Sequence, residues 1–503
     1  MLEHLFQSFT SASLLAAIVG LLVLNFLRSS FSSRNREPPG PTPLPLLGNF
    51  FQVDFDNLHI SLADLSKTYG SIFTVYLGLK KVVVLTGYKA VKEALVGYAD
   101  EFADREIIPI IEDFSPGHGL IFANGDSWKE MRRFTISTLK DFGTSKRISE
   151  ARIIEECNYL IEEFEKLSFL SGKPFDNSRV VSYAVANIIS SIMYNMRFDY
   201  NDPIYQSTVE RDQETITLLG SASIQIYNTF PWLRPILKNW KLLMKIIREN
   251  EAESMKIIAN LEETLNPEMC RCFVDAFLTQ KQKLEESGIK DSHYHYENLL
   301  QTVTNIFAAG TDTAGHTLQW ALLFMAKYPH IQDKVHEELR RVIGSRPVRV
   351  EDRKNLPYIN AVIHESQRLG NVGPHYVPHQ ASQDVTLNGY LIKKGTPVLP
   401  IFYSVLLDEN EWEAPHTFNP SRFLDKDGKF IKRDAFMPFS AGRRVCVGEG
   451  LARLELFLFF TSLFQRFRLT PPPGVTEDEL DLTPVVGLTH APTPHKLCAI
   501  SLQ

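Results

Sequence analysis

The sequence has no framework of paired cysteines and no acceptor site for N-linked glycans. Its five cysteines are scattered and odd in number, at positions 157, 270, 272, 446 and 498, whereas small disulfide-built proteins carry many cysteines at regular spacing. The nearest match to an Asn-x-Ser/Thr site, at Asn419, is blocked by Pro420. Both absences indicate reduced thiols and a body that lies in the cytosol.

The chain also lacks a large charge of one sign, internal repeats and a glycine- or serine-rich linker. Its formal net charge is −6 over 503 residues, whereas a nucleic-acid-binding protein normally shows a basic domain or stripe. A small-molecule or protein partner is therefore expected. With 44% hydrophobic residues the chain can bury a large core, but composition leaves the number of domains open.

One long apolar run is present, from residue 14 to residue 27, interrupted only by Asn25. As a helix this run reaches about 21 Å, and an extension back to Leu5 brings it near the roughly 30 Å of a hydrocarbon core. Arginines follow the run, whereas a secretory signal peptide carries its positive charge before it. We therefore predict a transmembrane anchor at residues 1–28 and a cytosolic remainder; a cleaved signal peptide is the alternative.

Residues 29–45 form the next segment, which is basic and rich in proline (EPPGPTPLP). Proline has no amide donor and prevents a helix from continuing, so we expect a stiff neck between the anchor and a body at residues 46–503. In the body, SIFTVYLG and KKVVVLTG are rich in β-branched and aromatic residues and predict a hairpin. Most later segments repeat apolar residues every three or four positions, which predicts a mainly helical fold with small β-sheets.

Cys446 stands in the stretch FSAGRRVCVGEG, among glycines and two arginines. An isolated cysteine is most often a buried structural residue. Here, however, Gly442 and Gly448 permit unusual backbone angles and the close approach of a flat ligand, and Arg443 and Arg444 are expected to lower the pKa of the thiol. An apolar helical run follows, so the sulfur is expected near a helix N-terminus, where partial positive charge favours a thiolate.

Such a thiolate could be a nucleophile, a zinc ligand or the axial ligand of a heme iron. Zinc needs further ligands, and no second cysteine or histidine lies within a few residues of Cys446. A nucleophile usually needs a histidine base, which cannot be located from the sequence. Heme needs only this one sulfur from the protein on its proximal side. The residues around Cys446 leave all three uses open.

The pattern F-x-x-G-x-R-x-C-x-G resembles the heme-binding signature of the cytochrome P450 superfamily, and here it consists of Phe439, Gly442, Arg444, Cys446 and Gly448. The resemblance covers residues 38 to 503. It is closest to the animal microsomal enzymes of family 2, and among these to the fish enzymes of subfamily K. It implies a single, triangular, mostly helical domain in the endoplasmic reticulum membrane.

Two further segments, ESQR and NPSRF, resemble the ExxR pair of this family and the arginine that completes it, at Glu365, Arg368 and Arg422. Residues three apart share one face of a helix, so the first two can pair and the second arginine can complete a network. Such a network would brace the core beside the cysteine loop. The alternative for an isolated ExxR segment is an ordinary surface ion pair.

The segment AAGTDT lies inside a predicted helix of about 30 residues and resembles the family's A-G-x-D/E-T motif. A freed backbone carbonyl or a bulge is expected near Gly310, because glycine and threonine are poor choices inside a helix; the alternative is a glycine in a packing seam. By the resemblance, this helix passes over the open face of the heme. Asp312 and Thr313 are the expected catalytic residues, which supply the protons that cleavage of O₂ consumes. Ala314 stands where close relatives often have another hydroxyl residue, which thins this expected proton network.

By the same resemblance, the cofactor is heme b (iron protoporphyrin IX) and its metal ligand is Cys446. Trp128 and Arg132 lie one helical turn apart in GDSWKEMRRF and can reach the same propionate. Each of the cofactor-binding candidates could equally be a surface residue when taken alone. The full set of expected cofactor-binding residues is Arg105, Trp128, Arg132, His379, Phe439 and Arg444.

The implied reaction is monooxygenation of the unspecific-monooxygenase type, in which one oxygen atom of O₂ enters a C–H bond and the other becomes water. Electrons would come from NADPH through NADPH-cytochrome P450 reductase, with cytochrome b5 as a further candidate partner. Arg133, Lys140 and Arg443 are candidates for a basic docking face, and an ordinary solvated face is the alternative.

The expected pocket segments are rich in Ile, Phe and Val and poor in charge, and they comprise residues 107–122, 305–313, 371–377 and 485–488. An apolar substrate is therefore expected: a fatty acid, a steroid or a xenobiotic. Two other functions stay open, a heme- and lipophile-binding protein without turnover and a heme-thiolate isomerase. The pair of Asp312 and Thr313 favours the monooxygenase, because oxygen activation needs protons.

Overall fold

The computed structural model of the chain describes residue 20 and residues 36–144, 148–171, 174–289, 291–374 and 377–502. The predicted anchor at residues 1–28 lies outside this part of the chain, apart from Gly20. Within the described ranges, no helix is both long and apolar enough to cross a membrane.

Helices dominate the described chain, as the apolar periodicity predicted. Their bounds are α2 Leu58–Tyr69, α3 Gly87–Lys92, α4 Pro109–Phe114, α5 Gly125–Leu139, α6 Ile148–Ser171, α7 Ser178–Tyr194, α8 Pro203–Gly220, α9 Ala222–Thr229, α10 Lys238–Glu263, α11 Phe273–Glu286, α12 Tyr296–Lys327, α13 Pro329–Val342, α14 Pro357–Gly370, α15 Phe402–Leu406 and α16 Glu449–Arg466. Short helical segments add η1 Phe50–Gln52, η2 Glu93–Gly97, η3 Lys140–Thr144, η4 Pro231–Ile236, η5 Val350–Asn355, η6 Pro420–Phe423, η7 Gly442–Arg444 and η8 Glu477–Glu479.

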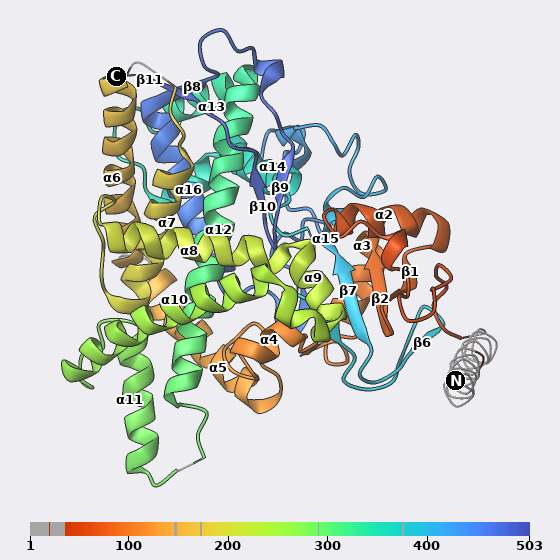
Figure 1. Cartoon of the computed structure of the whole chain (residues 1–503). Coiled ribbons are helices and arrows are strands. Elements are labelled where there is room, and N and C mark those ends of the chain that lie inside the picture. The colour runs from red at the N-terminus through yellow and green to blue at the C-terminus, as the bar shows by residue number, and fades with distance from the viewer. Residues whose placement is uncertain are drawn as a thin grey trace, which may run out of the picture.

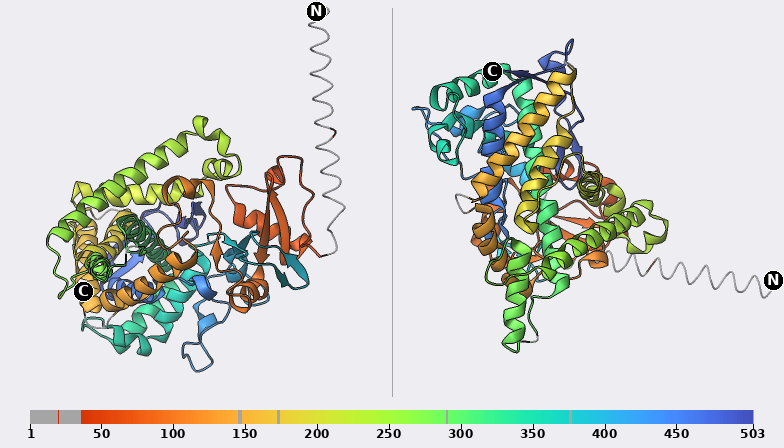
Figure 2. Two further views of the ribbon diagram at one scale, coloured as in Figure 1. Left: turned by 90° about the horizontal axis from the view of Figure 1, so that it is seen from below. Right: turned by 90° about the vertical axis from the view of Figure 1, so that its left-hand side faces the viewer.

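Strands form one five-stranded sheet, in the order β1-β2-β7-β4-β3, and three two-stranded sheets in the described residues. The predicted hairpin is confirmed, because β1 and β2 are antiparallel. Figures 1 and 2 show this sheet to one side of the main helices, next to α2 and α3. The strands are β1 Ile72–Leu77, β2 Lys80–Thr86, β3 Asp104–Arg105, β4 His379–Gln380, β5 Val385–Leu387, β6 Tyr390–Ile392, β7 Pro397–Ile401, β8 Phe467–Thr470, β9 Pro484–Val486, β10 His490–Pro492 and β11 Cys498–Ser501.

Local sequence explains where several helices begin and end. Asp202 caps α8 by accepting hydrogen bonds from the amides of Ile204 and Tyr205, and Pro203 takes the first helical position, where its missing N–H costs nothing. Asn195 and Asn371 end α7 and α14 in the left-handed conformation, which asparagine adopts more readily than most residues.

The long helix α12 runs through the middle of the helical part (Figure 1) and packs on α7, α14, α16 and α8. The bulge expected near Gly310 is wrong, since α12 is a continuous α-helix from Tyr296 to Lys327. A Cβ at Gly310 would lie 2.6 Å from the Ile189 side chain of α7. The glycine therefore lets α7 and α12 approach closely, which agrees with the alternative of a glycine in a packing seam.

The described part of the neck, from residue 36 onward, lies against the sheet. Thr74 of β1 donates its amide to the carbonyl of Pro39 over 2.7 Å, and Lys81 of β2 pairs with Glu37 at 2.7 Å. A Cβ at Gly40 would lie 1.9 Å from the carbonyl oxygen of Thr74, so glycine is needed for this approach. This end of the neck is thus fixed to the body.

Candidate functional site

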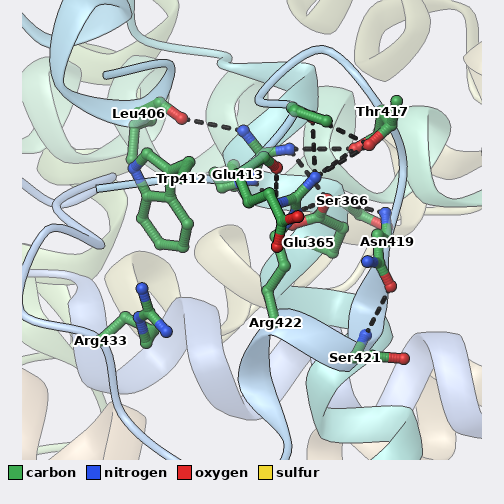
Figure 3. A network of polar contacts seen from close by, with 12 residues as sticks. Glu365, Ser366, Leu406, Trp412, Glu413, Thr417, Asn419, Ser421, Arg422 and Arg433 are labelled. Carbon is green, nitrogen blue, oxygen red and sulfur yellow. Dashed lines mark hydrogen bonds and ion pairs between the residues drawn. The ribbon is translucent and has the colours of Figure 1, made fainter. Parts of the chain in front are cut away.

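A buried network joins Glu365 and Arg368 of α14 to Arg422 of η6, and Figure 3 shows Glu365 and Arg422 within it. Both Glu365 and Arg368 have no exposed surface, and the guanidinium of Arg368 donates to the two carboxylate oxygens at 2.7 and 2.8 Å. Arg422 approaches the same carboxylate at 3.3 Å. The predicted trio is therefore confirmed, and its complete burial rules out an ordinary surface ion pair.

The arginines of this network also hold the chain between β7 and η6. Arg368 donates to the carbonyl of Leu406 at 2.9 Å and to that of Thr417 at 3.2 Å, and Arg422 donates to the carbonyl of Ala414 at 2.8 Å. Glu365 accepts in turn from the amide of Asn419 at 2.9 Å. One carboxylate and two arginines thus fix a long irregular segment that precedes the cysteine loop.

The cysteine loop is held in place by a glycine with a positive φ. Gly442 has φ +73°, and a Cβ there would lie 1.7 Å from the carbonyl oxygen of Leu95. The amide of Cys446 donates to the carbonyl of Phe439 over 3.0 Å, which closes the loop. Gly448 is the N-cap of α16, so the sulfur lies close to a helix N-terminus, as the sequence predicted.

The surroundings of the thiol differ in one respect from the prediction. Cys446 has an exposed side chain, although burial by the surrounding protein raises its pKa. Both observations hold if the sulfur faces a hollow within the protein. Arg132 is the nearby cation that favours the thiolate. The expectation for Arg443 and Arg444 was wrong, because these side chains point elsewhere: Arg443 pairs with Asp100 at 2.7 Å and Arg444 donates to the carbonyl of Ala103 at 2.6 Å.

Five of the six predicted cofactor-binding residues form one cluster, which is centred on Trp128. Arg444 stacks on the Trp128 ring at 3.7 Å from the ring centroid, and Arg132 lies at 5.8 Å. Arg105 of β3 is opposite His379 of β4 in the sheet and repels both Arg132 and Arg444. The structure therefore brings Arg105, Trp128, Arg132, His379 and Arg444 together, and Phe439 lies in the adjacent cysteine loop.

The arginines of this cluster form no ion pair among the described residues, although the charge of Asp104 acts on Arg444. Burial, with repulsion from Arg132, lowers the pKa of Arg105 to about 9. Burial, with repulsion chiefly from Arg105, lowers the pKa of Arg444 to about 8. The pKa of His379 lies well below its ordinary value for the same two reasons, burial and Arg105. Crowding three cationic groups in this way is costly unless an anion joins them.

Unsatisfied polar atoms indicate what kind of anion would suit the cluster. Arg105 Nε and Arg444 Nη1 are buried donors with no hydrogen-bond partner in the described chain, and His379 Nε2 is a further buried atom without one; a buried unpaired donor costs about 1–3 kcal/mol. A ligand with several oxygen acceptors and negative charge, such as the two carboxylates of heme, fits these atoms. The cluster and the exposed sulfur therefore suit the cofactor that the sequence pattern implies.

On α12, the predicted catalytic pair points in two directions. Ala309 and Thr313, one turn apart, are exposed in the middle of an otherwise mostly buried helix, so neighbouring side chains leave them uncovered. Thr313 donates its hydroxyl to the carbonyl of Ala309 over 2.7 Å. Asp312 is 2% exposed and instead accepts a hydrogen bond from Thr489. The structure therefore leaves Thr313 exposed and buries Asp312.

Asn124 is a site residue that sequence reasoning missed. Its Oδ1 accepts from the Arg105 amide at 2.7 Å and from the Arg444 guanidinium at 2.8 Å, and its Nδ2 donates to the Arg105 carbonyl at 2.8 Å. It thereby fixes two arginines that are 339 positions apart in the chain (444 − 105). Its position directly before α5 was the only available signal, and that signal usually indicates a helix cap.

Comparison with known proteins decides the family. The family model described as Cytochrome P450 matches residues 38–499. The chain belongs to the cytochrome P450 family. It is 60% identical to cytochrome P450 2K1 of Oncorhynchus mykiss, over 100% of this chain and 99% of that protein. Cytochrome P450 2K6 of Danio rerio is 56% identical, with 91% and 90% covered. Cytochrome P450 2C23 of Rattus norvegicus is 42% identical, with 98% and 99% covered.

These matches confirm the resemblance to family 2 and to its subfamily K. A cytochrome P450 is an oxidoreductase of the monooxygenase class, and membership in the family implies a heme cofactor, redox partners and small-molecule substrates. The mostly helical fold with small sheets agrees with this assignment.

Proposed function

We propose that this cytochrome P450 is a heme-thiolate monooxygenase that inserts one oxygen atom from O₂ into lipophilic substrates, with electrons from NADPH delivered by NADPH-cytochrome P450 reductase. The observation that carries the proposal is the pairing of an exposed cysteine sulfur in a glycine loop with a buried cation cluster that lacks its anion. Residues 46–503 would form the catalytic domain, after an anchor at 1–28 and the neck at 29–45.

Cys446 would be the axial ligand of heme b, and the propionates would be bound by Arg105, Trp128, Arg132, His379 and Arg444. Phe439 would pack beside the proximal face, where Arg453 of α16 lies 5.0 Å from its ring centroid. When bound, the heme supplies the redox centre that activates O₂, and its thiolate ligand favours O–O cleavage. The family relationship and the unsatisfied donors of the cluster support these roles.

Thr313 would hold a proton or a water molecule at the hollow. Its hydroxyl has one hydrogen, which the Ala309 carbonyl accepts in the structure, and its oxygen can still accept from water. Asp312 would supply protons from behind the helix. Ala314 is buried and adds no hydroxyl, so the local relay would depend on Thr313.

An apolar compound is the substrate class that we propose: a fatty acid, a steroid or a xenobiotic. Ile110 and Ile111 of α4 pack in one apolar cluster with Leu218 of α8 and Tyr227 of α9. Of these elements, α4 lies within the segment 107–122 that was expected to line the pocket. Clusters of this kind favour apolar guests with few polar groups.

We further propose that the protein lies at the endoplasmic reticulum membrane with its catalytic domain in the cytosol. A set of exposed apolar residues near the neck, here called the apolar rim, supports contact with lipid. Ordinary soluble surfaces rarely gather such residues. Its members are Leu44, Leu46, Phe51, Leu79, Trp232 and Ile236, which are 45 to 77% exposed.

A basic face for the reductase would include Arg133 and Lys140, which are both exposed. Arg443 is a weaker member, since it already pairs with Asp100. Cytochrome b5 would compete for the same face, because both partners would meet complementary charge there.

The first test of this proposal is a spectroscopic test of whether Cys446 ligates the heme iron. The reduced full-length protein with carbon monoxide is expected to show the strongly red-shifted band of thiolate ligation, and Cys446→His is expected to lose it. Cys498→Ser, at a free cysteine of β11, is the matched control and should keep the band. Retention of the band in Cys446→His would contradict the proposal.

Turnover requires a second measurement. The protein reconstituted with reductase and NADPH should convert fatty acids, steroids or drug-like compounds to oxygenated products. Binding of heme and lipophile without any product would favour a carrier, and rearrangement of a peroxide without reductase would favour an isomerase.

A further inference from the structure

Behind Thr313, two helices that pack on each other each bury an aspartate, and the charge of Asp312 acts on Asp212. Asp312 of α12 is 2% exposed and Asp212 of α8 is 7% exposed, and α8 packs on α12 (Figure 1). No inference from sequence singled out Asp212, because it lies 100 positions before its partner (312 − 212). No cation pairs with Asp212 in the part of the chain that the structure describes.

The two carboxyl groups have different surroundings. Asp312 Oδ2 accepts a hydrogen bond from the hydroxyl of Thr489, whereas Oδ1 lies 3.4 Å from Nε2 of His316 without a hydrogen bond among the described residues. Asp212 has no such support: its Oδ2 is buried and has no hydrogen-bond partner among the described residues. A buried carboxyl group without a hydrogen bond or a cation is more stable in its neutral form.

Charges near the pair come from few groups. The charged group that acts on Asp212 is Asp312. Its neighbour Arg211 turns toward α10, where it pairs with Glu253 at 2.5 Å. Gln213 donates to Ser182 of α7 at 2.8 Å. Burial, and then the charge of Asp312, raise the pKa of Asp212 well above its ordinary value.

We propose that Asp212 and Asp312 form a buried acid pair that holds one proton on Asp212, in reserve for the proton supply at Thr313. The proposal rests on the proposed monooxygenase function. In the step, the proton leaves the Asp212 carboxyl group for the Asp312 carboxylate, and Asp212 becomes the anion. A proton from solvent, arriving through the partly buried His316, restores the neutral acid. Asp212 acts through Asp312 and is a positioning residue.

Backbone contacts also link the acid pair to the turn between β9 and β10, which includes part of the segment expected to line the substrate pocket. Thr489 belongs to the turn between β9 and β10, whose Leu488 donates its amide to the Ile216 carbonyl of α8 over 3.2 Å. A Cβ at Gly220 of α8 would lie 2.1 Å from the carbonyl carbon of Gly487 in the same turn. The turn and α8 therefore pack tightly against each other, beside the acid pair that α8 and α12 supply.

The first readout does not depend on activity. Above the ordinary carboxyl range, near pH 4, the native state holds a proton on Asp212 that the unfolded state has lost, so stability falls as pH rises toward the raised pKa. In wild type the unfolding equilibrium constant should rise up to about tenfold per pH unit from this group. Asp212→Asn cannot ionise and should lack that component, so its urea midpoint should exceed that of wild type increasingly with pH.

The second readout is the use of electrons. With reductase, NADPH and a turned-over substrate, Asp212→Asn should divert severalfold more electrons to hydrogen peroxide, while the carbon monoxide band and substrate affinity stay unchanged. Asp212→Glu should restore the coupling. Asp212→Ser is a second uncharged variant in case Asp212→Asn does not fold.

Asp275→Asn is the matched control. Asp275 is also fully buried, but Arg271 pairs with it at 2.6 Å, so its loss should reduce stability and leave the coupling unchanged. Equal pH slopes in wild type and Asp212→Asn would overturn the acid pair. A changed slope with unchanged coupling would show a stored proton that the reaction does not use, which also overturns the proposal. If wild type shows no turnover at all, the proposed function fails, and the pH slope still decides whether the pair exists.

Discussion

Glu365 and its two arginines show how single residues can hold a large irregular segment. Burying a charge costs several kcal/mol unless a partner and hydrogen bonds compensate, and both Glu365 and Arg368 are fully buried. The carboxylate meets Arg368 twice, Arg422 once and the Asn419 amide once. Each oxygen is therefore engaged, and removal of the charge would leave two arginines without their anion.

We predict that Glu365→Gln lowers the free energy of unfolding by about 3–5 kcal/mol, because Arg368 would remain buried and uncompensated. Urea unfolding followed by circular dichroism measures the change. Glu285→Gln is the matched control: Glu285 pairs with Lys281 on α11 and is largely exposed, so it should cost about 0.5 kcal/mol or less. A similar loss in both variants would contradict the prediction.

At the same scale, the sequence predicted the residues whose spacing is local and missed those that meet through the fold. Glu365 and Arg368 are three apart, and Phe439 to Gly448 form one continuous motif, so both were found. Asn124 bonds to Arg105 and Arg444 only because β3, α5 and η7 converge. The direction of the Arg444 side chain could not be predicted from the sequence either, because its contacts with Trp128 and Ala103 determine it.

Among the elements, α12 crosses the core and also holds the segment before α5 in place. Two side chains about two turns apart on one face hold the segment before α5: Asn298 accepts from the Gly119 amide at 2.8 Å, and Asn305 accepts from the amides of Leu120 and Ile121 at 3.0 and 3.1 Å. This segment belongs to the region expected to line the substrate pocket. One helix therefore positions both Thr313 and part of the pocket wall.

We predict that Asn305→Leu releases this segment, because two amides lose their acceptor at nearly constant side-chain volume. The expected loss of stability is about 1–3 kcal/mol, and hydrogen exchange at residues 119–121 should become faster. Thr304→Ala is the control, since the Thr304 hydroxyl bonds only to the Leu300 carbonyl of its own helix. Unchanged exchange in Asn305→Leu would show that other contacts hold the segment.

Element types were predictable where the periodicity was long, as in α12 and the β1–β2 hairpin. The interior of α12 was predicted wrongly, because local propensity at Gly310 suggested a bulge whereas close packing on Ile189 keeps the helix regular. The short strands β3 and β4 gave no signal, since two residues carry no periodicity. Their pairing nevertheless sets Arg105 opposite His379.

Over the whole molecule, the neck and the apolar rim lie on the same part of the surface. Phe50 of η1 lies 6.0 Å from Phe230, and Phe230 lies 6.3 Å from Trp232 of η4, measured between ring centroids. The turn between β1 and β2 adjoins them, because a Cβ at Gly78 would lie 2.9 Å from Thr229. Segments far apart in the sequence thus form one apolar surface next to the chain that follows the predicted anchor.

If this rim enters the lipid interface, Trp232 should be close to acyl chains in the full-length protein reconstituted in vesicles. Trp232 is 74% exposed, whereas Trp320 and Trp412 are 2% and 1% exposed, and aromatic rings prefer the membrane interface. We predict that lipids with quenchers near the headgroup end of the acyl chains quench part of the tryptophan fluorescence. Trp232→Phe should remove the quenched component, and Trp412→Phe should leave it. Equal quenching before and after Trp232→Phe would place the rim in water, and membrane contact would then rest on the N-terminal segment alone.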